Sequence, residues 1–327
     1  MRRSFIVGTG HAVPTRVLSN ADLAAFVDTS DAWIRERTGI VERRVASEVE
    51  VTSDLAAAAA RAAFADARVE PASIDLLVVA TFTADQPLPS CAAIVQAKLG
   101  LAQIGAFDLA AACAGFVYGL AVADQFLRGG GARRALVIGA EILTRVTDWT
   151  DRTTAVLYGD GAGAAILEAR DAEQGGVEGF SLGSDGRYAS SVYIPAGGSA
   201  EPPGALDLAA DRSKMRLQGK EIFRHAVENM VSASLAALER AGMTVKDVDW
   251  FVPHQASERI ASAVGTRLGA DMARFVMNLE RRGNTSSASI PIALDEARRD
   301  GRIRPGHRVL VTALGAGLAW GAAVFTL

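Results

Sequence analysis

Residues Phe107–Leu120 read FDLAAACAGFVYGL and place a lone cysteine, Cys113, between a strand-like run and a helix-like run. Phe116 and Leu120 have the spacing of one helix face. A cysteine at the first turn of a helix meets unpaired N–H groups and the positive end of the helix dipole, and both favour the thiolate. Small neighbours leave room for a substrate at the sulfur. Because free cysteines are often buried simply for packing, this stretch alone leaves both interpretations open.

The composition of the chain indicates a globular protein. It has 327 residues, of which 50% are hydrophobic and 22% charged, and its mean hydropathy is +0.18. This suits one large or two medium domains. The net charge of −3 argues against nucleic acid as a partner. No apolar run is long enough for a membrane span, the N-terminal run is too short for a signal peptide, and two cysteines suggest no disulfide framework. We expect a soluble, cytoplasmic protein.

Predicted strands and helices alternate along the chain. Near-continuous apolar runs at 74–81 and 135–140 predict strands that are covered on both faces. The alanine-rich stretch 52–67 predicts a closely packed helix. Further strands are predicted at 248–253, 275–278 and 308–313, and further helices at 219–241, 257–268 and 286–299.

The two parts of the chain resemble each other. The strand and helix that end at Leu99-Gly100 are matched by those that end at Leu268-Gly269, and 107–127 is matched by 275–297. This repetition predicts two similar α/β halves, 1–170 and 171–327, packed together. A functional site is expected where the halves meet.

Three stretches of the second half carry polar groups inside otherwise apolar elements. His254 ends a predicted strand, Asn284 begins a predicted helix, and Leu314–Gly317 forms a turn with exposed N–H groups. Each has a simpler explanation alone: a structural histidine, a helix N-cap and close strand packing. The internal symmetry, however, places all three at one end of the second half. Cys113 occupies the corresponding end of the first half. A cysteine, a histidine, an asparagine and free amides suit acyl transfer.

Two other features receive structural interpretations. The run GDGAGAAIL at 159–167 lacks the spacing of a dinucleotide-binding loop and leads into a strand, so it predicts close strand packing. No nicotinamide or metal is implied. Cys91 has no counterparts to His254 and Asn284 and is interpreted as a packing residue.

Several short motifs, in this order, make the chain similar to one known family. They are Gly8-Thr-Gly, Thr29-Ser-Asp-Ala-Trp-Ile, Arg37-Thr-Gly-Ile, Ala110-Ala-Ala-Cys-Ala-Gly-Phe, Thr150-Asp-Arg, Gly159-Asp-Gly-Ala-Gly-Ala, His254-Gln-Ala, Gly283-Asn-Thr-Ser and Trp320-Gly. With them the chain resembles the β-ketoacyl-acyl-carrier-protein synthase III family of the thiolase-like superfamily. The resemblance implies duplicated α/β halves packed as a five-layered αβαβα sandwich, and a homodimer.

The resemblance also implies a Cys–His–Asn triad. Cys113 would accept the acyl group of an acyl-CoA primer, and His254 and Asn284 would stabilise the enolate formed when malonyl-acyl carrier protein loses CO2. The N–H groups of Cys113 and Ala316 would hold the oxyanion, although the family usually has glycine at the latter position. The products would be β-ketoacyl-acyl carrier protein, CoA and CO2, which initiate fatty acid or related polyketide synthesis. No cofactor is implied.

The resemblance assigns further residues to the binding of coenzyme A. Trp33 and Arg152 would sandwich the adenine, with Arg37 near its phosphate. Ser257 stands beside the pantetheine tunnel, where the family commonly has asparagine.

Two more assignments concern protein partners. A basic patch at the tunnel mouth would dock the carrier protein, and the matching positions are Arg224, Arg259 and Arg267. Leu88 lies in a loop that, in the family, reaches across a dimer interface and closes the partner's acyl pocket. A leucine there, rather than a bulky aromatic, predicts a pocket roomier than acetyl needs.

Alternatives remain at this point. The chain could load an unusual starter, or transfer an acyl group without decarboxylation, in a specialised pathway. A hydroxymethylglutaryl-CoA synthase fits the CoA motifs less well. An inactive partner subunit would be expected to lack Cys113.

Overall fold

The first sheet organises the N-terminal half of the protein. The computed structural model describes residues 1–202 and 212–327, and this sheet has the strand order β1-β7-β6-β4-β5. Its strands are β1 (Arg2–Ala12), β4 (Leu76–Ala80), β5 (Gly105–Leu109), β6 (Arg134–Glu141) and β7 (Gly161–Asp171). The runs predicted at 74–81 and 135–140 are β4 and β6, and nearly all their residues are buried.

The second sheet repeats this arrangement in the C-terminal half. Its order is β11-β12-β13-β8. The strands are β8 (Gly176–Ser184), β11 (Trp250–Pro253), β12 (Arg308–Gly315) and β13 (Ala319–Thr326). The parallel pair β11-β12 corresponds to β4-β6, and the antiparallel pairs β12-β13 and β13-β8 correspond to β6-β7 and β7-β1. The predicted duplication is therefore confirmed, while the boundary at 170/171 stays a prediction.

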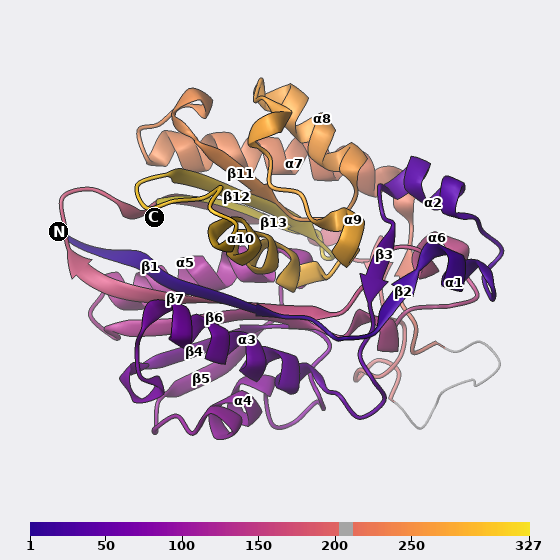
Figure 1. Ribbon diagram of the computed structural model, residues 1–327, viewed down its shortest axis with the longest axis horizontal. Coiled ribbons are helices and arrows are strands. Elements are labelled where there is room, and N and C mark those ends of the chain that lie inside the picture. Colours follow the sequence, from indigo (N-terminus) through magenta and orange to yellow (C-terminus); the bar gives the residue numbers. More distant parts are fainter. Residues whose placement is uncertain (203–211) are drawn as a thin grey trace.

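Helices form the other three layers (Figure 1). The main helices are α3 (Thr52–Ala67), α4 (Cys91–Leu99), α5 (Gly115–Arg128), α7 (Gly219–Arg240), α8 (Glu258–Leu268) and α10 (Ser289–Arg299). Helices α3 and α4 cover the outer face of the first sheet, α7 and α8 cover the second, and α5 and α10 lie between the sheets. The α/β fold with five layers, αβαβα, is thus confirmed.

Smaller elements border these layers. They are β2 (Val17–Ser19), β3 (Glu42–Arg44), β9 (Val192–Tyr193), β10 (Arg216–Leu217), α1 (Asn20–Ala24), α2 (Asp31–Thr38), α6 (Arg152–Ala155) and α9 (Leu279–Arg282). No helix of the described chain is long and apolar enough to cross a membrane.

Glycine and alanine explain how closely the layers approach. A Cβ atom at Gly10 of β1 would lie 2.3 Å from the backbone nitrogen of Ala63 in α3. A Cβ at Gly163 of β7 would lie 2.7 Å from the nitrogen of Ile292 in α10. No real side chain fits at such distances, so these strands need glycine. The glycine-rich run at 159–167 therefore serves close packing, as predicted.

The prediction of a strand at 275–278 is wrong. Only Phe275 forms a bridge, to Phe251, at the place where the first half has β5. The Gln255 side chain explains the loss, because its oxygen accepts hydrogen bonds from the backbone N–H groups of Asn278 and Leu279 at 3.1 and 3.2 Å. Side-chain bonds replace the ladder there.

Candidate active site

Cys113 lies in a tight turn between β5 and α5. A short 3-10 turn, Ala112–Ala114, leads directly into α5, which begins at Gly115, so Cys113 lies at the turn where the helix begins, as predicted. Ala112 has a φ of +44°, a left-handed conformation that is costly for alanine. Gly315, at the end of β12, packs against this turn, since a Cβ there would lie 2.6 Å from the Cys113 nitrogen. The second half therefore supports the turn that presents the sulfur.

The symmetry of the two halves extends to this turn. Ser286–Ala288 forms a matching 3-10 turn before α10, and Ser286 has a φ of +49°. Ser287 is thus the counterpart of Cys113.

One cavity brings most of the predicted site residues together. It has a volume of about 750 Å³ and lies between the halves. The predicted residues that line it are Arg37, Cys113, His254, Ser257, Arg259, Asn284 and Ala316. Trp33, Leu88, Arg152, Arg224 and Arg267 do not line it. The three residues of the predicted triad, which are 141 and 30 positions apart in sequence, face the same space.

Burial governs the acid–base state of Cys113. It raises the pKa of the thiol to about 12, and the neighbouring Ser286 hydroxyl offsets this only in part. The expectation that the helix terminus alone favours a thiolate is therefore not met, because desolvation between the halves outweighs it. The resting residue is a thiol, and its proton must leave as the sulfur attacks.

His254 is held as a neutral hydrogen-bond donor. Its Nδ1 lies 2.8 Å from the hydroxyl of Ser289, which also accepts from the N–H of Gln255 at 3.4 Å. The Ser289 proton is then available to Nδ1, so Nε2 carries the ring proton. Burial lowers the pKa of His254 to about 4, which keeps the ring uncharged at neutral pH.

Asn284 is oriented by its own turn. Its Oδ1 accepts a hydrogen bond from the N–H of Ser286 at 2.9 Å, and its backbone pairs with the segment around Tyr158. The Nδ2 amide has no acceptor among the described residues and opens on the cavity. Asn284 and His254 therefore both present N–H groups, which suits the stabilisation of negative charge rather than the removal of a proton.

The turn after β12 supplies a further donor. Ala316 follows the last residue of β12 and lines the cavity beside Cys113. Its N–H donates to no acceptor in the described part of the chain. The alanine side chain does not remove this group, so the position can serve an oxyanion.

Glu141 connects the two halves behind the cysteine, and it belongs to none of the motifs recognised in the sequence. It is fully buried, and its Oε2 accepts from the Thr81 hydroxyl at 3.2 Å and the Thr83 N–H at 3.2 Å. Its Oε1 lies 3.1 Å from the hydroxyl of Ser287, which donates to the carbonyl of Ala80 at 2.9 Å. The single proton of the Ser287 hydroxyl therefore has two acceptors within reach, the Ala80 carbonyl and Oε1 of Glu141.

The protonation of Glu141 predicts an unusual dependence of stability on pH. Burial raises the pKa of this carboxyl to about 7, above its value of 4.5 in the unfolded chain. The stability contributed by the protonated form is complete below pH 4.5 and is lost as the pH rises through 7. Glu141→Gln keeps the donor and does not titrate. We expect the Tm of the wild type to fall relative to this variant by about 2 °C or more between pH 5 and 8.

Calorimetry at several pH values checks this prediction. Glu48→Gln, a change at an exposed carboxyl, controls for the lost charge. A Tm difference between wild type and Glu141→Gln that is the same at pH 5 and 8 would refute it.

Trp33 and two arginines form a cluster outside the cavity. The guanidinium carbons of Arg37 and Arg152 lie 4.7 and 5.0 Å from the centroid of the Trp33 ring. Arg152 is half exposed, and its other contacts are to the exposed Asp28. It can therefore move away from the ring, which would make room for a flat group between the two. Arg37 belongs to both the cluster and the cavity.

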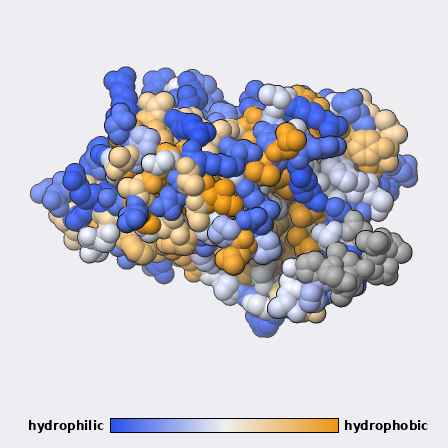
Figure 2. Space-filling model, turned by 90° about the horizontal axis from the view of Figure 1, so that it is seen from below, coloured by the Kyte–Doolittle hydropathy of each residue, from blue (hydrophilic) through white to orange (hydrophobic). Residues whose placement is uncertain are grey.

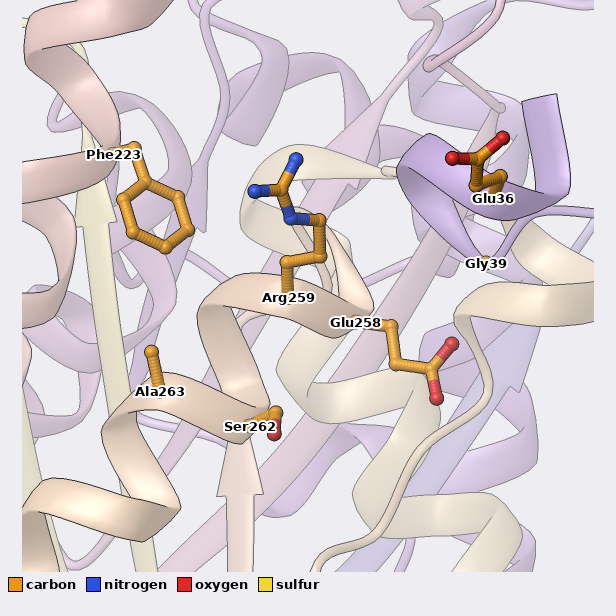
Figure 3. Close-up of a pocket in the computed structure, with 7 residues that line it drawn as sticks. All are labelled: Glu36, Gly39, Phe223, Glu258, Arg259, Ser262 and Ala263. Atoms are coloured by element: carbon orange, nitrogen blue, oxygen red, sulfur yellow. The ribbon is translucent and has the colours of Figure 1, made fainter. Parts of the chain in front are cut away.

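A groove leads to the cavity between α2, α7 and α8. Its volume is about 390 Å³. Figure 3 shows Arg259 of α8 between Phe223 of α7 and Glu36 of α2, while Glu258 turns toward Gly39. Arg259 lines both the groove and the cavity and so marks their junction.

The other two predicted docking residues are exposed on the same helices. Arg224 lies on α7 and Arg267 on α8, two turns after Arg259. The mouth is not purely basic, because Glu36 and Glu258 line the same groove.

Leu88 and Cys91 lie away from the cavity. Leu88 is 84% exposed in the loop after β4 and does not reach the cavity of its own chain. Cys91 is fully buried in the core between α3, α4 and the first sheet, where it packs as expected. No cluster of three or more potential metal ligands occurs among the described residues.

Comparison with known proteins gives a consistent result. The family model described as 3-oxoacyl-[acyl-carrier-protein (ACP)] synthase III matches residues 107–186, and the model for its C terminal matches residues 238–327. Curated proteins named β-ketoacyl-[acyl-carrier-protein] synthase III, from Rhizorhabdus wittichii and Cereibacter sphaeroides, are each 48% identical to this chain. The matches cover 99% of both chains in the first case and 98% in the second.

Solved structures show the same similarity. The 3-oxoacyl-[acyl-carrier-protein] synthase III from Aquifex aeolicus has a TM-score of 0.92 and 40% identity, over 99% of this chain and 100% of that one. The priming β-ketosynthase of the R1128 polyketide biosynthetic pathway has a TM-score of 0.94 and 38% identity, over 100% and 97%.

Proposed function

Because this chain belongs to the β-ketoacyl-[acyl-carrier-protein] synthase III family, we propose that it condenses an acyl-CoA primer with malonyl-acyl carrier protein. Family members are condensing enzymes of the acyltransferase type. The observation that carries the proposal is the cavity in which Cys113 shares one space with His254, Asn284 and Ala316. The chemistry needs no cofactor.

The first step loads the primer. The sulfur of Cys113 attacks the thioester carbon, and the N–H groups of Cys113 and Ala316 hold the oxyanion. The C–S bond to CoA then breaks, and the proton of the Cys113 thiol passes to the leaving CoA sulfur. The result is an acyl-cysteine thioester and free CoA.

The second step forms the carbon–carbon bond. The thioester carbonyl of malonyl-acyl carrier protein accepts from Nε2–H of His254 and Nδ2–H of Asn284. These donors stabilise the enolate as CO2 leaves, which is where negative charge develops. The enolate carbon attacks the acyl-cysteine carbonyl, the Cys113 thiolate departs, and a proton restores the thiol. The product is β-ketoacyl-acyl carrier protein.

The CoA end of the primer is assigned to the Trp33 cluster. We expect Trp33→Ala to raise the KM for acyl-CoA about tenfold, because a stacking contact is worth roughly 1–3 kcal/mol, while kcat changes less than about twofold. The measurement is steady-state release of CoA at varied acyl-CoA. Trp33→Phe keeps a ring and should recover most of the affinity. An unchanged KM in Trp33→Ala would remove the cluster from the CoA site.

The carrier protein is assigned to the groove at the cavity mouth. Arg259 lines this groove, and Arg224 and Arg267 are exposed on the same two helices, α7 and α8. Their positive charges are suited to an acidic partner. Glu36 and Glu258 would set the orientation of that partner by repulsion.

A homodimer is part of the proposal. Strand β5 pairs with β4 on one side, and no strand of the described chain covers its other edge. An open edge invites pairing with a second copy. Leu88 is exposed on the same half, and Figure 2 shows hydrophobic residues near the middle of the face seen from below. Leu88 would then contact the partner's acyl pocket and leave it roomier than acetyl needs.

One experiment separates this function from its alternative, starter loading or acyl transfer without condensation. The protein is given acetyl-CoA and malonyl-acyl carrier protein, and the carrier products are identified by mass. Condensation yields the 3-oxobutyryl carrier protein and CO2. In a parallel reaction the malonyl carrier protein is replaced by carrier protein with a free pantetheine thiol. Acetyl carrier protein formed there, with no CO2 in the malonyl reaction, would favour simple transfer, an activity for which the two N–H donors of His254 and Asn284 are unnecessary.

A further inference from the structure

Tyr158 places a hydroxyl without a partner in the active-site cavity. The residue is 6% exposed and lines the same space as Cys113. Its hydroxyl makes no hydrogen bond to any described residue, yet it is not enclosed by protein atoms and opens on the cavity. Solvent can pair with a hydroxyl that opens on the cavity, but a bound acyl group that fills the cavity displaces this solvent, and the partner must then come from the acyl group itself.

The surroundings of Tyr158 show where in the cavity it stands. It packs in a cluster with Leu143 and Met215, bordered by Phe82 and Val192. All four of these neighbours line the cavity with Tyr158, and none of them has a charged side chain. This is the apolar part of the cavity, where the carbon chain of a bound acyl group would lie.

The backbone places Tyr158 next to the reacting groups. It forms an isolated bridge with Asn284, and the N–H of Gly159 donates to the Asn284 carbonyl at 3.0 Å. The pKa of the phenol is raised, by burial first and then by the nearby Cys113. Tyr158 is therefore a neutral donor close to the sulfur and inside an otherwise apolar pocket.

Such a donor discriminates between acyl groups. An aliphatic chain would cover the hydroxyl and leave it unpaired, which costs binding energy. An acyl chain that carries an oxygen would instead form a hydrogen bond with the Tyr158 hydroxyl. Sites built around a polar partner reject analogues that lack it far more strongly than purely apolar pockets can.

We infer that Tyr158 is a specificity-determining residue that selects starter acyl groups carrying a hydroxyl or carbonyl oxygen on the chain. The inference rests on the proposed function, since it requires Cys113 to be acylated from a CoA thioester. It concerns the acyl chain only, because the thioester oxygen is already served by the N–H groups of Cys113 and Ala316.

The test compares matched primers on matched variants. Butyryl-CoA, 3-hydroxybutyryl-CoA and 4-hydroxybutyryl-CoA are assayed for acylation of Cys113, with kcat/KM from CoA release. We expect the wild type to prefer the better hydroxylated primer over butyryl-CoA by at least about tenfold. Tyr158→Phe removes only the oxygen. In this variant the ratio should fall about tenfold or more, partly because kcat/KM for butyryl-CoA rises.

A second tyrosine provides the control. The hydroxyl of Tyr118 donates to the Gly183 carbonyl at 2.8 Å and does not line the cavity, so Tyr118→Phe should leave the ratio unchanged. Equal ratios in the wild type and Tyr158→Phe would overturn the inference while leaving the proposed function intact. Failure of all three primers while acetyl-CoA still acylates Cys113 would also overturn only the inference, and failure of acetyl-CoA as well would overturn both.

Discussion

Replacing Cys113 with serine is expected to lower kcat/KM for condensation by about 1,000-fold or more and to abolish the acyl-enzyme. The hydroxyl is a much weaker nucleophile than sulfur at neutral pH, and removal of a nucleophile has effects of this size or larger. Burial, which already raises the thiol pKa to about 12, disfavours an alkoxide even more. The measurements are the initial rate of product formation and the mass of the protein after exposure to acetyl-CoA.

Cys91 provides the matched control. It is the only other cysteine, it is fully buried in the first half, and it lines no part of the cavity. Cys91→Ser should form the acyl adduct at close to the wild-type rate, with some loss of stability. An adduct that persists in Cys113→Ser and disappears in Cys91→Ser would contradict the assignment of the nucleophile.

Changes at His254 and Asn284 are expected to separate the two steps. His254→Ala and Asn284→Ala each remove one N–H donor from the enolate and should lower decarboxylation by about 100-fold or more. Acylation of Cys113 relies on other N–H groups and should fall much less. Release of CO2 from malonyl-acyl carrier protein and labelling of Cys113 by acetyl-CoA are measured separately.

Asn284→Asp sharpens this prediction. An aspartate keeps an oxygen for the N–H of Ser286, so the turn at 284–286 is preserved. It replaces the Nδ2 donor by an acceptor, so decarboxylation should fall at least as far as in Asn284→Ala. Decarboxylation that survives in Asn284→Asp but not in Asn284→Ala would show that Asn284 acts only through the turn.

The fold could be predicted largely from the sequence because its repeats are local. Apolar runs that are buried on both faces, such as 74–81 and 135–140, can hardly be anything but central strands. The predicted strand at 275–278 failed for a reason that lies elsewhere in the chain. Gln255, 20 positions away from Phe275, binds the N–H groups that a ladder would use, and periodicity carries no sign of it.

The candidate site was predicted unevenly. Residues within recognisable motifs, such as Cys113 and His254, fall in the cavity as expected. Glu141 and Tyr158 were missed, because their significance depends on contacts with Ser287 and on the space beside Cys113. A charged residue that ends a buried strand was the available signal for Glu141. The high pKa of the thiol was also missed, since the burial that causes it exists only once the two halves pack.

The central claim is that an acyl group on Cys113 is the intermediate that condenses with malonyl-acyl carrier protein. The most direct measurement charges the protein with acetyl-CoA, removes the excess, adds malonyl-acyl carrier protein, and follows the intact protein mass and the carrier products with time. The account predicts that the acetyl adduct on Cys113 decays at the rate at which 3-oxobutyryl carrier protein and CO2 appear, in equal amounts. Product that forms while the adduct persists would contradict it.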